Sequence, residues 1–510
     1  MRASGILMPI FSLPGPYGIG TLGQAAYDFV DFLAETGQTY WQMLPIGPTG
    51  YGDSPYQSFS AFAGNPYFID PEFLLRQGLL TESELPPPQP EGRVDYGALY
   101  QQRPPMLQKA AARLLAAPPA SYQDFCAEHN FWLDDHALFM AVKAQQGQAG
   151  LDQWPDALRT RQPQAIAQAK HELAGEIAYH KAVQFLFYQQ WTALKAYANR
   201  QGVKLIGDIP IYVSPDSSDL WTRPDLFQTD GAVRLTHVAG CPPDAFSADG
   251  QLGGNPLFRW DAMKKDGYSW WTKRVKAMSK LYDIVRIDHF RGFDSYYAIP
   301  AKDDTARNGE WRKGPGMDLF RTMEKKLGKL NIIVEDLGFL TPSVLKLVKD
   351  SGFPGMKVIQ FAFDSREGSD YLPHNYEKHC VVYTGTHDND TLMGWMKTAP
   401  KASVKFAKEY LNLTEEEGFN WGMMRAAWAS VGDMAIVPMQ DLIGIGSEGR
   451  MNTPSTLGGN WEWRATSDQI TGKLAKRLYK YMEMYGRLNK DQEEEEETEA
   501  EEKKVSAEEK

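Results

Sequence analysis

The sequence predicts an α/β protein built on a (β/α)8 barrel, with a helical insertion between strands 2 and 3 and smaller loop insertions. Eight short apolar runs rich in Val and Ile recur along the 510 residues and alternate with longer stretches of helical character. Near-continuous apolar strands are typical of a parallel sheet covered by helices, and eight such units favour a closed barrel. A doubly wound open sheet is the alternative, but no Gly-rich dinucleotide-binding loop follows the first run.

The predicted strands cover the whole chain at uneven intervals. In order they are residues 5–10 (GILMPI), 40–46 (YWQMLPI), 203–213 (VKLIGDIPIYV), 284–290 (IVRIDHF), 332–337 (IIVEDL), 356–363 (MKVIQFAF), 380–384 (CVVYT) and 434–442 (MAIVPMQDL).

The interval between the second and third runs is about 155 residues long and contains the Pro-rich segments ELPPPQPEGR and RLLAAPPASYQ. One helix and its short connections need far fewer residues. We therefore expect an inserted, mainly helical subdomain at about residues 70–180, within a catalytic barrel that spans residues 1–490. The interval closes with a helical pattern for which Gly202 is placed as the C-terminal stop.

Most of the net charge of −11 comes from the C-terminal tail. Residues 491–510 carry eleven acidic side chains and three lysines, a net charge of −8, which leaves the rest of the chain nearly balanced at −3. Like-charge repulsion and the lack of apolar residues predict a solvated, disordered tail, and a partner-binding role is the alternative. No basic stripe indicates a nucleic-acid partner.

The cysteines and the apolar runs indicate the compartment. Cys126, Cys241 and Cys380 are too few and too scattered for a disulfide framework or a Cys-rich zinc site. No run approaches the roughly 20 apolar residues of a membrane span, and the N-terminus lacks a signal-type segment. We therefore expect a soluble, cytoplasmic protein with no membrane or nucleic-acid partner.

Five of the eight runs carry an acid at or near their C-terminal end: Asp208, Asp288, Glu335, Asp388 and Asp441. The C-terminal ends of all barrel strands open on one face, so these acids should converge on one cavity. Any one of them alone could be a helix N-cap or a turn acid. Together, with His and Arg beside them, they predict an active site.

Two of these acids have surroundings that favour different protonation states. Arg286 and Asp288 point to the same side of a strand, about 7 Å apart at their α-carbons, so we expect Arg286 to keep Asp288 ionised. Glu335 follows the apolar segment NIIV, where desolvation would raise its pKa towards that of a general acid. Cleavage of a glycosidic bond needs one carboxylate at the anomeric carbon and one acid at the leaving oxygen.

Three neighbouring side chains fit this chemistry. Asp388 could hold sugar hydroxyls and support an oxocarbenium-like transition state, and His289 and His387 would donate hydrogen bonds to hydroxyls, although a lone histidine at a strand end is more often structural. A metal-hydrolase barrel is the alternative, but the chain contains neither His-x-His nor His-Glu-x-x-His.

Two loops are typical of a carbohydrate cleft. Residues 48–68 place six aromatic side chains among Gly, Ser and Pro: Tyr51, Tyr56, Phe59, Phe62, Tyr67 and Phe68. Aromatic faces can stack on sugar rings, although a hydrophobic loop plug would account for some of them. Residues 241–260 are rich in Gly and Pro, and Phe246 lies near the tip of this segment, as in a lid over a substrate.

Seven longer motifs extend these observations: SLPGPYGIGTLG, YGDSPYQSFSAFAGNPYFID, GDIPIYV, VRIDHFRGF, EDLG, YTGTHDNDT and NTPSTLGGNWEWR. On these motifs, from about residue 5 to residue 464, the chain resembles the 4-α-glucanotransferases called amylomaltases or disproportionating enzymes, glycoside hydrolase family 77 of the α-amylase clan. The resemblance implies a (β/α)8 barrel with helical insertions, no metal or organic cofactor, and maltooligosaccharides and other α-1,4-glucans as substrates.

The resemblance also implies roles for individual residues. Asp288 would be the nucleophile, Glu335 the acid/base and Asp388 the stabiliser of the transition state. The residues that look like ligands of the donor-side glucose are Tyr56, Asp208, Arg286, His289 and His387. Tyr51 resembles a position associated with longer glucan chains.

One position departs from the family pattern. Where the family usually reads GQLWGNP, this chain reads GQLGGNP, so Gly253 replaces a Trp that looks like an acceptor-side stacking surface. The change removes a large apolar face and loosens the backbone. We expect weaker acceptor binding and a larger share of hydrolysis.

The sequence thus favours a glucan disproportionating enzyme that moves segments of 1,4-α-D-glucan to the 4-hydroxyl of an acceptor glucan or glucose by a retaining double displacement. An α-glucan hydrolase is one alternative, because it would share the carboxylates and differ in water access. A non-catalytic glucan-binding protein is another, but it would require a missing nucleophile or acid, and neither is missing. The oligomeric state is left open.

Overall fold

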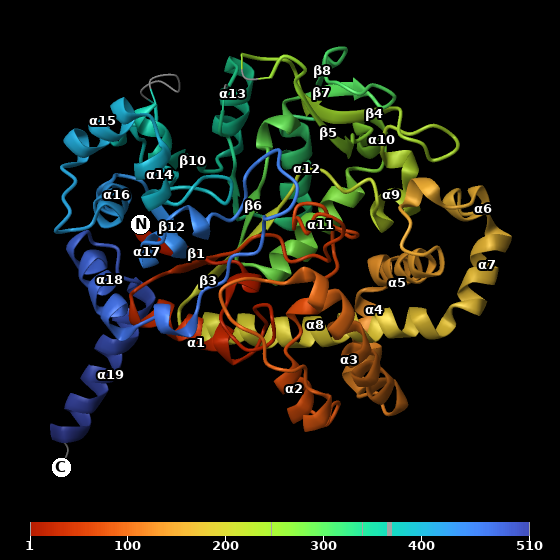
Figure 1. Ribbon diagram of the computed structural model, residues 1–510, viewed down its shortest axis with the longest axis horizontal. Helices are drawn as coiled ribbons and strands as arrows, with labels where there is room; N and C mark the ends of the chain where they lie inside the picture. Colours follow the sequence, from red (N-terminus) through yellow and green to blue (C-terminus); the bar gives the residue numbers. More distant parts are fainter. Residues whose placement is uncertain (1, 246, 339, 365–369, 509–510) are drawn as a thin grey trace.

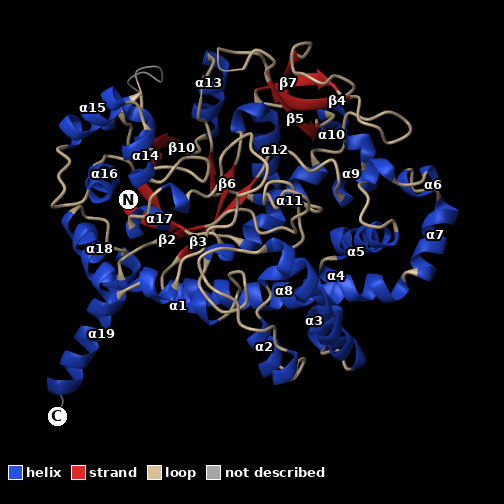
Figure 2. Ribbon diagram, in the orientation of Figure 1, coloured by secondary structure: helices blue, strands red, loops and turns tan. Residues whose placement is uncertain are grey.

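The computed structural model describes residues 2–245, 247–338, 340–364 and 370–508. Eight parallel strands form its central sheet, in the order β10-β11-β12-β1-β2-β3-β6-β9, and helices surround them (Figures 1 and 2). The strands are β1 Ala3–Leu7, β2 Tyr40–Gln42, β3 Lys204–Ile209, β6 Ile284–Ile287, β9 Ile332–Val334, β10 Gly355–Val358, β11 Cys380–Tyr383 and β12 Met434–Pro438. Each predicted run overlaps one of them.

The sheet closes between its first and last strands. The backbone N–H of Val334 in β9 donates to the carbonyl of Pro354 just before β10, at 3.0 Å. The side chain of Asp336 accepts a 2.8 Å hydrogen bond from the backbone N–H of Met356 in β10. These bonds join the two edges, so the predicted (β/α)8 barrel is confirmed.

Helices follow the strands and also fill the long interval between β2 and β3. From the N-terminus to β3 they are α1 Gln24–Glu35, α2 Pro71–Arg76, α3 Tyr96–Ala116, α4 Ala120–Glu128, α5 Asn130–Gln145, α6 Asp156–Arg159, α7 Pro163–Glu172 and α8 Ala174–Arg200. Further along are α9 Ser218–Thr222, α10 Trp260–Lys265, α11 Ser269–Leu281, α12 Met317–Leu327, α13 Pro342–Ser351, α14 Leu392–Thr398, α15 Lys401–Leu411, α16 Phe419–Ala429, α17 Met439–Ile443, α18 Gly472–Met484 and α19 Lys490–Glu508. Within the described ranges, no helix is both long and apolar enough to cross a membrane.

The long helix α8 anchors the aromatic loop that follows β2. Its Gln184 side chain accepts from the backbone N–H of Gly64 at 2.8 Å and donates to the carbonyl of the same residue at 2.9 Å. Gln190 makes the equivalent pair of bonds with the backbone of Asp70, at 2.7 and 3.2 Å. Buried apolar residues of α8 and of the barrel belong to one continuous core. The helices between β2 and β3 therefore support a loop at the mouth of the barrel.

A second sheet lies beside the barrel and was not predicted. Its antiparallel order is β5-β4-β7-β8, with β4 His237–Cys241, β5 Gln251–Pro256, β7 Ser295–Pro300 and β8 Glu310–Lys313 (Figure 2). The segment 241–260, which we expected to form a lid loop, supplies the end of β4, the whole of β5 and the start of α10. Its Gly and Pro content masked the strands, because these residues are depleted in most strands. Phe246 lies outside the described residues.

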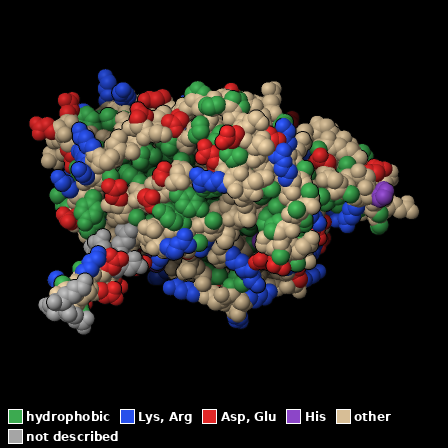
Figure 3. Space-filling view, turned by 90° about the horizontal axis from the view of Figure 1, so that it is seen from below, with side chains coloured by type: hydrophobic (Ala, Val, Ile, Leu, Met, Phe, Trp, Pro, Cys, Tyr) green, Lys and Arg blue, Asp and Glu red, His purple; other side chains and the backbone are tan. Residues whose placement is uncertain are grey.

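The acidic tail, which we expect from the sequence to be solvated and disordered, is helical in the structure. Lys490–Glu508 form α19, which projects away from the body and carries acidic and basic side chains (Figures 1 and 3). Glu, Ala and Lys are strong helix formers, and Lys503 lies 3.5 Å from Glu499 one turn earlier. Local helix propensity therefore accounts for the conformation of this segment.

One strand-end acid, Asp441, ties parts of the fold together through hydrogen bonds. Asp441 lies in α17, just after β12, and is 2% exposed. Its carboxylate accepts hydrogen bonds from the hydroxyl of Thr384 at 2.8 Å and from the backbone N–H of Leu392 at 2.9 Å. Both oxygens therefore tie β12 to the chain after β11, and burial raises the pKa of this carboxyl to about 7. Asp441 does not join the other acids.

Asp441 should make the stability of the fold depend on pH. An unfolded Asp titrates near pH 4, so between about pH 4 and about pH 7 the folded state binds this proton more tightly. The free energy of unfolding should therefore fall as the pH rises through this window, and Asp441→Asn should lack this component. Urea denaturation of both proteins at intervals from pH 5 to pH 8 measures the difference. A difference that stays constant across the window would contradict this assignment.

Candidate active site

Four of the five strand-end acids gather at the C-terminal mouth of the barrel. Asp208 lies within β3, Asp288 and Glu335 follow directly after β6 and β9, and Asp388 lies in the loop after β11. Asp288 is acted on by the charges of both Asp208 and Glu335. The prediction that these acids converge is thus correct for four positions and wrong for Asp441, whose carboxylate is used inside the fold.

The guanidinium of Arg286 holds two of the acids together. Asp208 and Arg286 are register partners on the neighbouring strands β3 and β6. Arg286 Nη1 lies 2.8 Å from Asp208 Oδ1 and 3.3 Å from Asp288 Oδ1, and its side chain is 3% exposed. Burial lowers the pKa of Arg286, but the charges of the two carboxylates raise it by more. The net pKa of Arg286 is therefore well above its ordinary value. A permanent buried cation therefore fixes the positions of Asp208 and Asp288.

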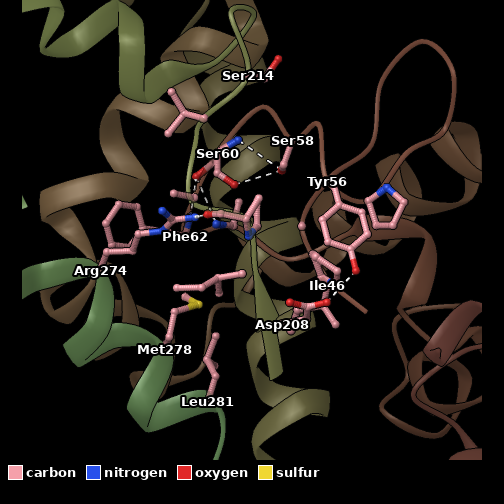
Figure 4. A pocket seen from close by; sticks show the side chains of 18 of the residues that line it. Ile46, Tyr56, Ser58, Ser60, Phe62, Asp208, Ser214, Arg274, Met278 and Leu281 are labelled. Atoms are coloured by element: carbon pink, nitrogen blue, oxygen red, sulfur yellow. Dashed lines mark hydrogen bonds between the residues drawn. The ribbon is translucent and has the colours of Figure 1, made fainter. Parts of the chain in front are cut away.

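Tyr56 connects the aromatic loop to this group. Its hydroxyl donates to Asp208 Oδ2 at 2.6 Å, and Figure 4 shows the hydroxyl directed at that carboxylate. Both residues line a cavity of about 50 Å³. The same hydroxyl lies 3.1 Å from His387 Nδ1, and the two rings stack with centroids 4.7 Å apart. Burial, followed by the charge of Asp208, raises the pKa of Tyr56, so the phenol stays protonated and donates. Tyr56 and His387 form one rigid wall.

The protonation of Asp288 differs from the expectation. We expected Arg286 to keep the pKa of this carboxyl low. Instead, burial raises the pKa of Asp288 to about 7, and the charges of Glu335 and Asp208 add to the rise, while Arg286 and His387 oppose it. The desolvation of a carboxylate at the mouth of the barrel outweighs one neighbouring cation.

Glu335 is held entirely by backbone amides. Its Oε2 accepts from the N–H of His289 at 2.9 Å, and its Oε1 accepts from the N–H of Leu337 at 2.6 Å. Burial raises the pKa of Glu335, in the direction that the apolar strand predicted, while Arg286 and these two amides oppose the rise. Asp288 and Glu335 are therefore two interacting carboxyls that both protonate more readily than in water.

His289 adopts an unusual backbone conformation between these two acids. Its φ of 56° and ψ of 48° are left-handed, and the 3₁₀-helix Phe290–Phe293 starts directly after it. For a residue with a Cβ this conformation costs about 1 kcal/mol. Burial lowers the pKa of the His289 imidazole to about 4, and Arg291 lowers it further, so the ring is neutral near pH 7. A neutral imidazole can both donate and accept hydrogen bonds.

Asp388 is oriented by residues for which the sequence predicted no role. The side-chain amide of Asn452 donates to Asp388 Oδ1 at 2.7 Å. Arg450 donates to the carbonyls of Asp388 and Asn452, at 2.6 and 2.9 Å, and so ties the two loops together. His387 Nε2 lies 3.4 Å from Asp388 Oδ2. Asn452 stands in the motif NTPSTLGGNWEWR, but no local pattern indicated that its partner lies 64 positions away.

The remaining predicted positions lie outside this group. Tyr51 is 92% exposed on the aromatic loop. Gly253 lies on the exposed edge strand β5, two positions before Asn255, whose side chain donates to the carbonyl of Val213 at 3.0 Å and bonds Gln57. A Cβ at position 253 would lie 3.8 Å from Asn255 Oδ1, so a side chain there would start on the side of Asn255. Gly253 therefore faces the rim of the mouth.

The arrangement suits chemistry at an acetal carbon. It offers a carboxylate for attack, a second carboxyl for proton transfer, and neutral donors around them, which is the set that glycosidic bond cleavage requires. In the described part of the chain, His, Cys, Asp and Glu form no group of three or more with the geometry to hold a metal ion.

Comparison with known proteins gives one consistent result. The model of glycoside hydrolase family 77, described as 4-alpha-glucanotransferase, matches residues 8–470. The chain is 48% identical over 485 residues to a 4-alpha-glucanotransferase of Clostridium butyricum, covering 94% of this chain and 100% of the relative. It is 49% identical over 499 residues to one of Streptococcus pneumoniae, with 96% and 98% covered.

The structural similarity extends over the same length. The structure of amylomaltase from Streptococcus agalactiae in complex with acarbose is similar with a TM-score of 0.93 and 42% identity, covering 96% of this chain and 100% of that one. Amylomaltase from Corynebacterium glutamicum, at 17% identity and a TM-score of 0.74, covering 94% of this chain and 75% of that one, shares the fold. From the family match and these relatives, the chain belongs to glycoside hydrolase family 77.

Proposed function

We propose that the protein is a 4-α-glucanotransferase that moves segments of 1,4-α-D-glucan to the 4-hydroxyl of an acceptor glucan or glucose. The observation that carries this proposal is the pair of carboxyls at the ends of the neighbouring strands β6 and β9. Asp288 is fixed by Arg286, and Glu335 is fixed by two backbone amides. Membership of glycoside hydrolase family 77 supports the same reaction.

The first step transfers the donor segment to the protein. The ionised carboxylate of Asp288 attacks the anomeric carbon, and the bond from that carbon to the O4 of the next glucose breaks. Glu335 gives its proton to the departing oxygen, so the leaving glucan carries a new hydroxyl and Asp288 carries a glucosyl ester. The raised pKa values of both carboxyls fit a pair that shares one proton, and the reaction requires that proton to lie on Glu335.

The second step reverses the first with a different glucan. Glu335, now ionised, removes the proton from the 4-hydroxyl of the acceptor, whose oxygen attacks the anomeric carbon and releases Asp288. Two inversions retain the α configuration, and the number of glycosidic bonds does not change.

The side chains around the pair hold the donor sugar. Asp388, kept in place by Asn452, accepts sugar hydroxyls and opposes the positive charge that develops on the ring. The stacked wall of Tyr56 and His387 faces the same region, and neutral His289 supplies a hydrogen bond. These groups are ready before the substrate arrives, because the fold has already fixed them.

The acceptor decides between transfer and hydrolysis. Water competes with the 4-hydroxyl of a glucan, so transfer depends on an acceptor held in line with the ester. Exposed Gly253 on β5 offers no apolar face at the rim, which favours a larger share of hydrolysis than a residue with a broad side chain would allow.

The site and the thiols support the proposed substrates and compartment. Maltooligosaccharides and longer α-1,4-glucans fit an open barrel mouth with aromatic walls. The similar amylomaltase from Streptococcus agalactiae is in complex with acarbose, which supports recognition of glucan-like ligands. Cys126, Cys241 and Cys380 are all free thiols, which supports a reducing cytoplasm.

The function is tested by incubating the purified protein with maltotriose, separating products by length and following total reducing ends. We expect glucose and longer oligosaccharides with nearly constant reducing ends. Asp288→Asn should lower the rate by about 10⁴-fold or more, because no carboxylate remains to form the ester, while the fold is kept. Rising reducing ends without longer products would show a hydrolase, and full activity of Asp288→Asn would refute the assigned nucleophile.

Gly253→Trp should restore an acceptor surface. We expect acceptor binding about two- to tenfold tighter and a higher ratio of transfer to hydrolysis, because a stacked aromatic ring contributes about 0.5–1.5 kcal/mol. A Cβ here lies 3.1 Å from the carbonyl oxygen of Ala239, so the strand has to adjust slightly. Gly253→Ala is the matched control, since it stiffens the strand without adding a ring. An identical ratio in the Trp and Ala variants would show that no acceptor reaches this edge.

A further inference from the structure

The backbone at His289 forms a small turn around Glu335. The left-handed conformation of His289, followed by the 3₁₀-helix Phe290–Phe293, makes two successive amides converge on one residue. The N–H of His289 donates to Glu335 Oε2 at 2.9 Å, and the N–H of Phe290 donates to the backbone carbonyl of Glu335 at 3.1 Å. Successive amides around a left-handed residue form a concave site that favours anions.

The turn also links the two carboxyls through a single residue. Asp288 immediately precedes His289, and its own backbone N–H donates to the carbonyl of Ile209 in β3 at 2.9 Å. A change in the φ and ψ of His289 would therefore move the amide that holds Glu335, while Asp288 stays attached to the barrel through β3 and Arg286.

We propose that His289 positions Glu335 through its left-handed backbone, independently of any contact that its imidazole makes with a sugar. This inference rests on the function proposed above. The His289 amide holds one oxygen of Glu335 and the Leu337 amide holds the other, so the carboxyl has a single orientation when it exchanges its proton with the substrate. His289 is in this respect a positioning residue, and a residue that avoids left-handed backbone would release Glu335.

The electrostatic surroundings fit this role. The charged or titratable groups that act on Glu335 are Arg286 and Asp288 from β6 and the turn after it, and Asp336 next along the chain. The amides of His289 and Leu337 favour the ionised form of Glu335 and so oppose the effect of burial. Loss of the His289 amide would leave Glu335 with a higher affinity for its proton.

The test compares variants that all lack the imidazole. His289→Gly and His289→Asn tolerate left-handed backbone, whereas His289→Ala and His289→Ser tolerate it less well. With maltotriose as donor, we expect kcat/KM of the Ala variant to be about five- to tenfold below that of the Gly and Asn variants. The basic limb of the pH profile, where the general acid loses its proton, should lie at higher pH in the Ala variant than in the Gly and Asn variants.

A donor with an activated leaving group separates this effect from a general loss of structure. Fluoride leaves α-maltosyl fluoride without help from an acid, so its release in a single turnover depends on Asp288 and little on Glu335. We expect the Ala and Gly variants to release fluoride at rates within about twofold of each other. Thermal unfolding of each variant is recorded, and His289→Ser takes the place of His289→Ala if the latter does not fold.

Two results would overturn the proposal. Equal kcat/KM and equal basic limbs in the Gly, Asn, Ala and Ser variants would mean that only the imidazole matters. If fluoride release from α-maltosyl fluoride is also about five- to tenfold slower in the Ala variant than in the Gly variant, the turn acts on Asp288 or on the whole site. Absence of transfer by the wild-type protein would instead refute the proposed function, and the variants could then still be compared on hydrolysis of maltotriose.

Discussion

The ion pairs that buried Arg286 makes with Asp208 and Asp288 are the interactions on which the rest of the site depends. One guanidinium, 3% exposed, contacts a carboxylate from β3 and another from the end of β6. Without it, two carboxylates would face each other in a poorly solvated space, and removal of one partner of such a group typically costs about 3–5 kcal/mol. Asp208 in turn holds Tyr56, whose hydroxyl also contacts His387. The cation therefore organises both the reacting acid and the wall beside it.

The barrel and the segments inserted into it contribute different parts of the site. The parallel strands bring carboxylates from distant parts of the chain to one mouth, because all their C-terminal ends face the same way. The helices between β2 and β3 hold the aromatic loop through the side chains of Gln184 and Gln190. The loop after β12 contributes Asn452, which orients Asp388. The aromatic loop is thus tied to a long helix, and the loops of Asp388 and Asn452 are tied to each other, by a few specific hydrogen bonds.

Backbone groups are as important as side chains for the acid/base pair. Glu335 is held by the amides of His289 and Leu337, and Asp288 is anchored to β3 by its own amide. Amides of the main chain change neither charge nor rotamer, so they hold a carboxylate in place while its protonation state alternates between the two steps of the reaction. This arrangement requires a left-handed turn at His289, which strains the backbone of a residue that has a side chain.

The sequence alone determined the eight strands, the barrel and four of the acids at its mouth, because apolar runs and residues at strand ends are local patterns. The tertiary structure decided the rest. Asp441 is buried as an internal hydrogen-bond acceptor, and Asn452 meets Asp388 only in the folded chain. Burial outweighs Arg286 in setting the pKa of Asp288, and β5 of the second sheet forms in a segment rich in Gly and Pro. Desolvation and contacts between distant residues depend on packing, which no local pattern of residue types contains.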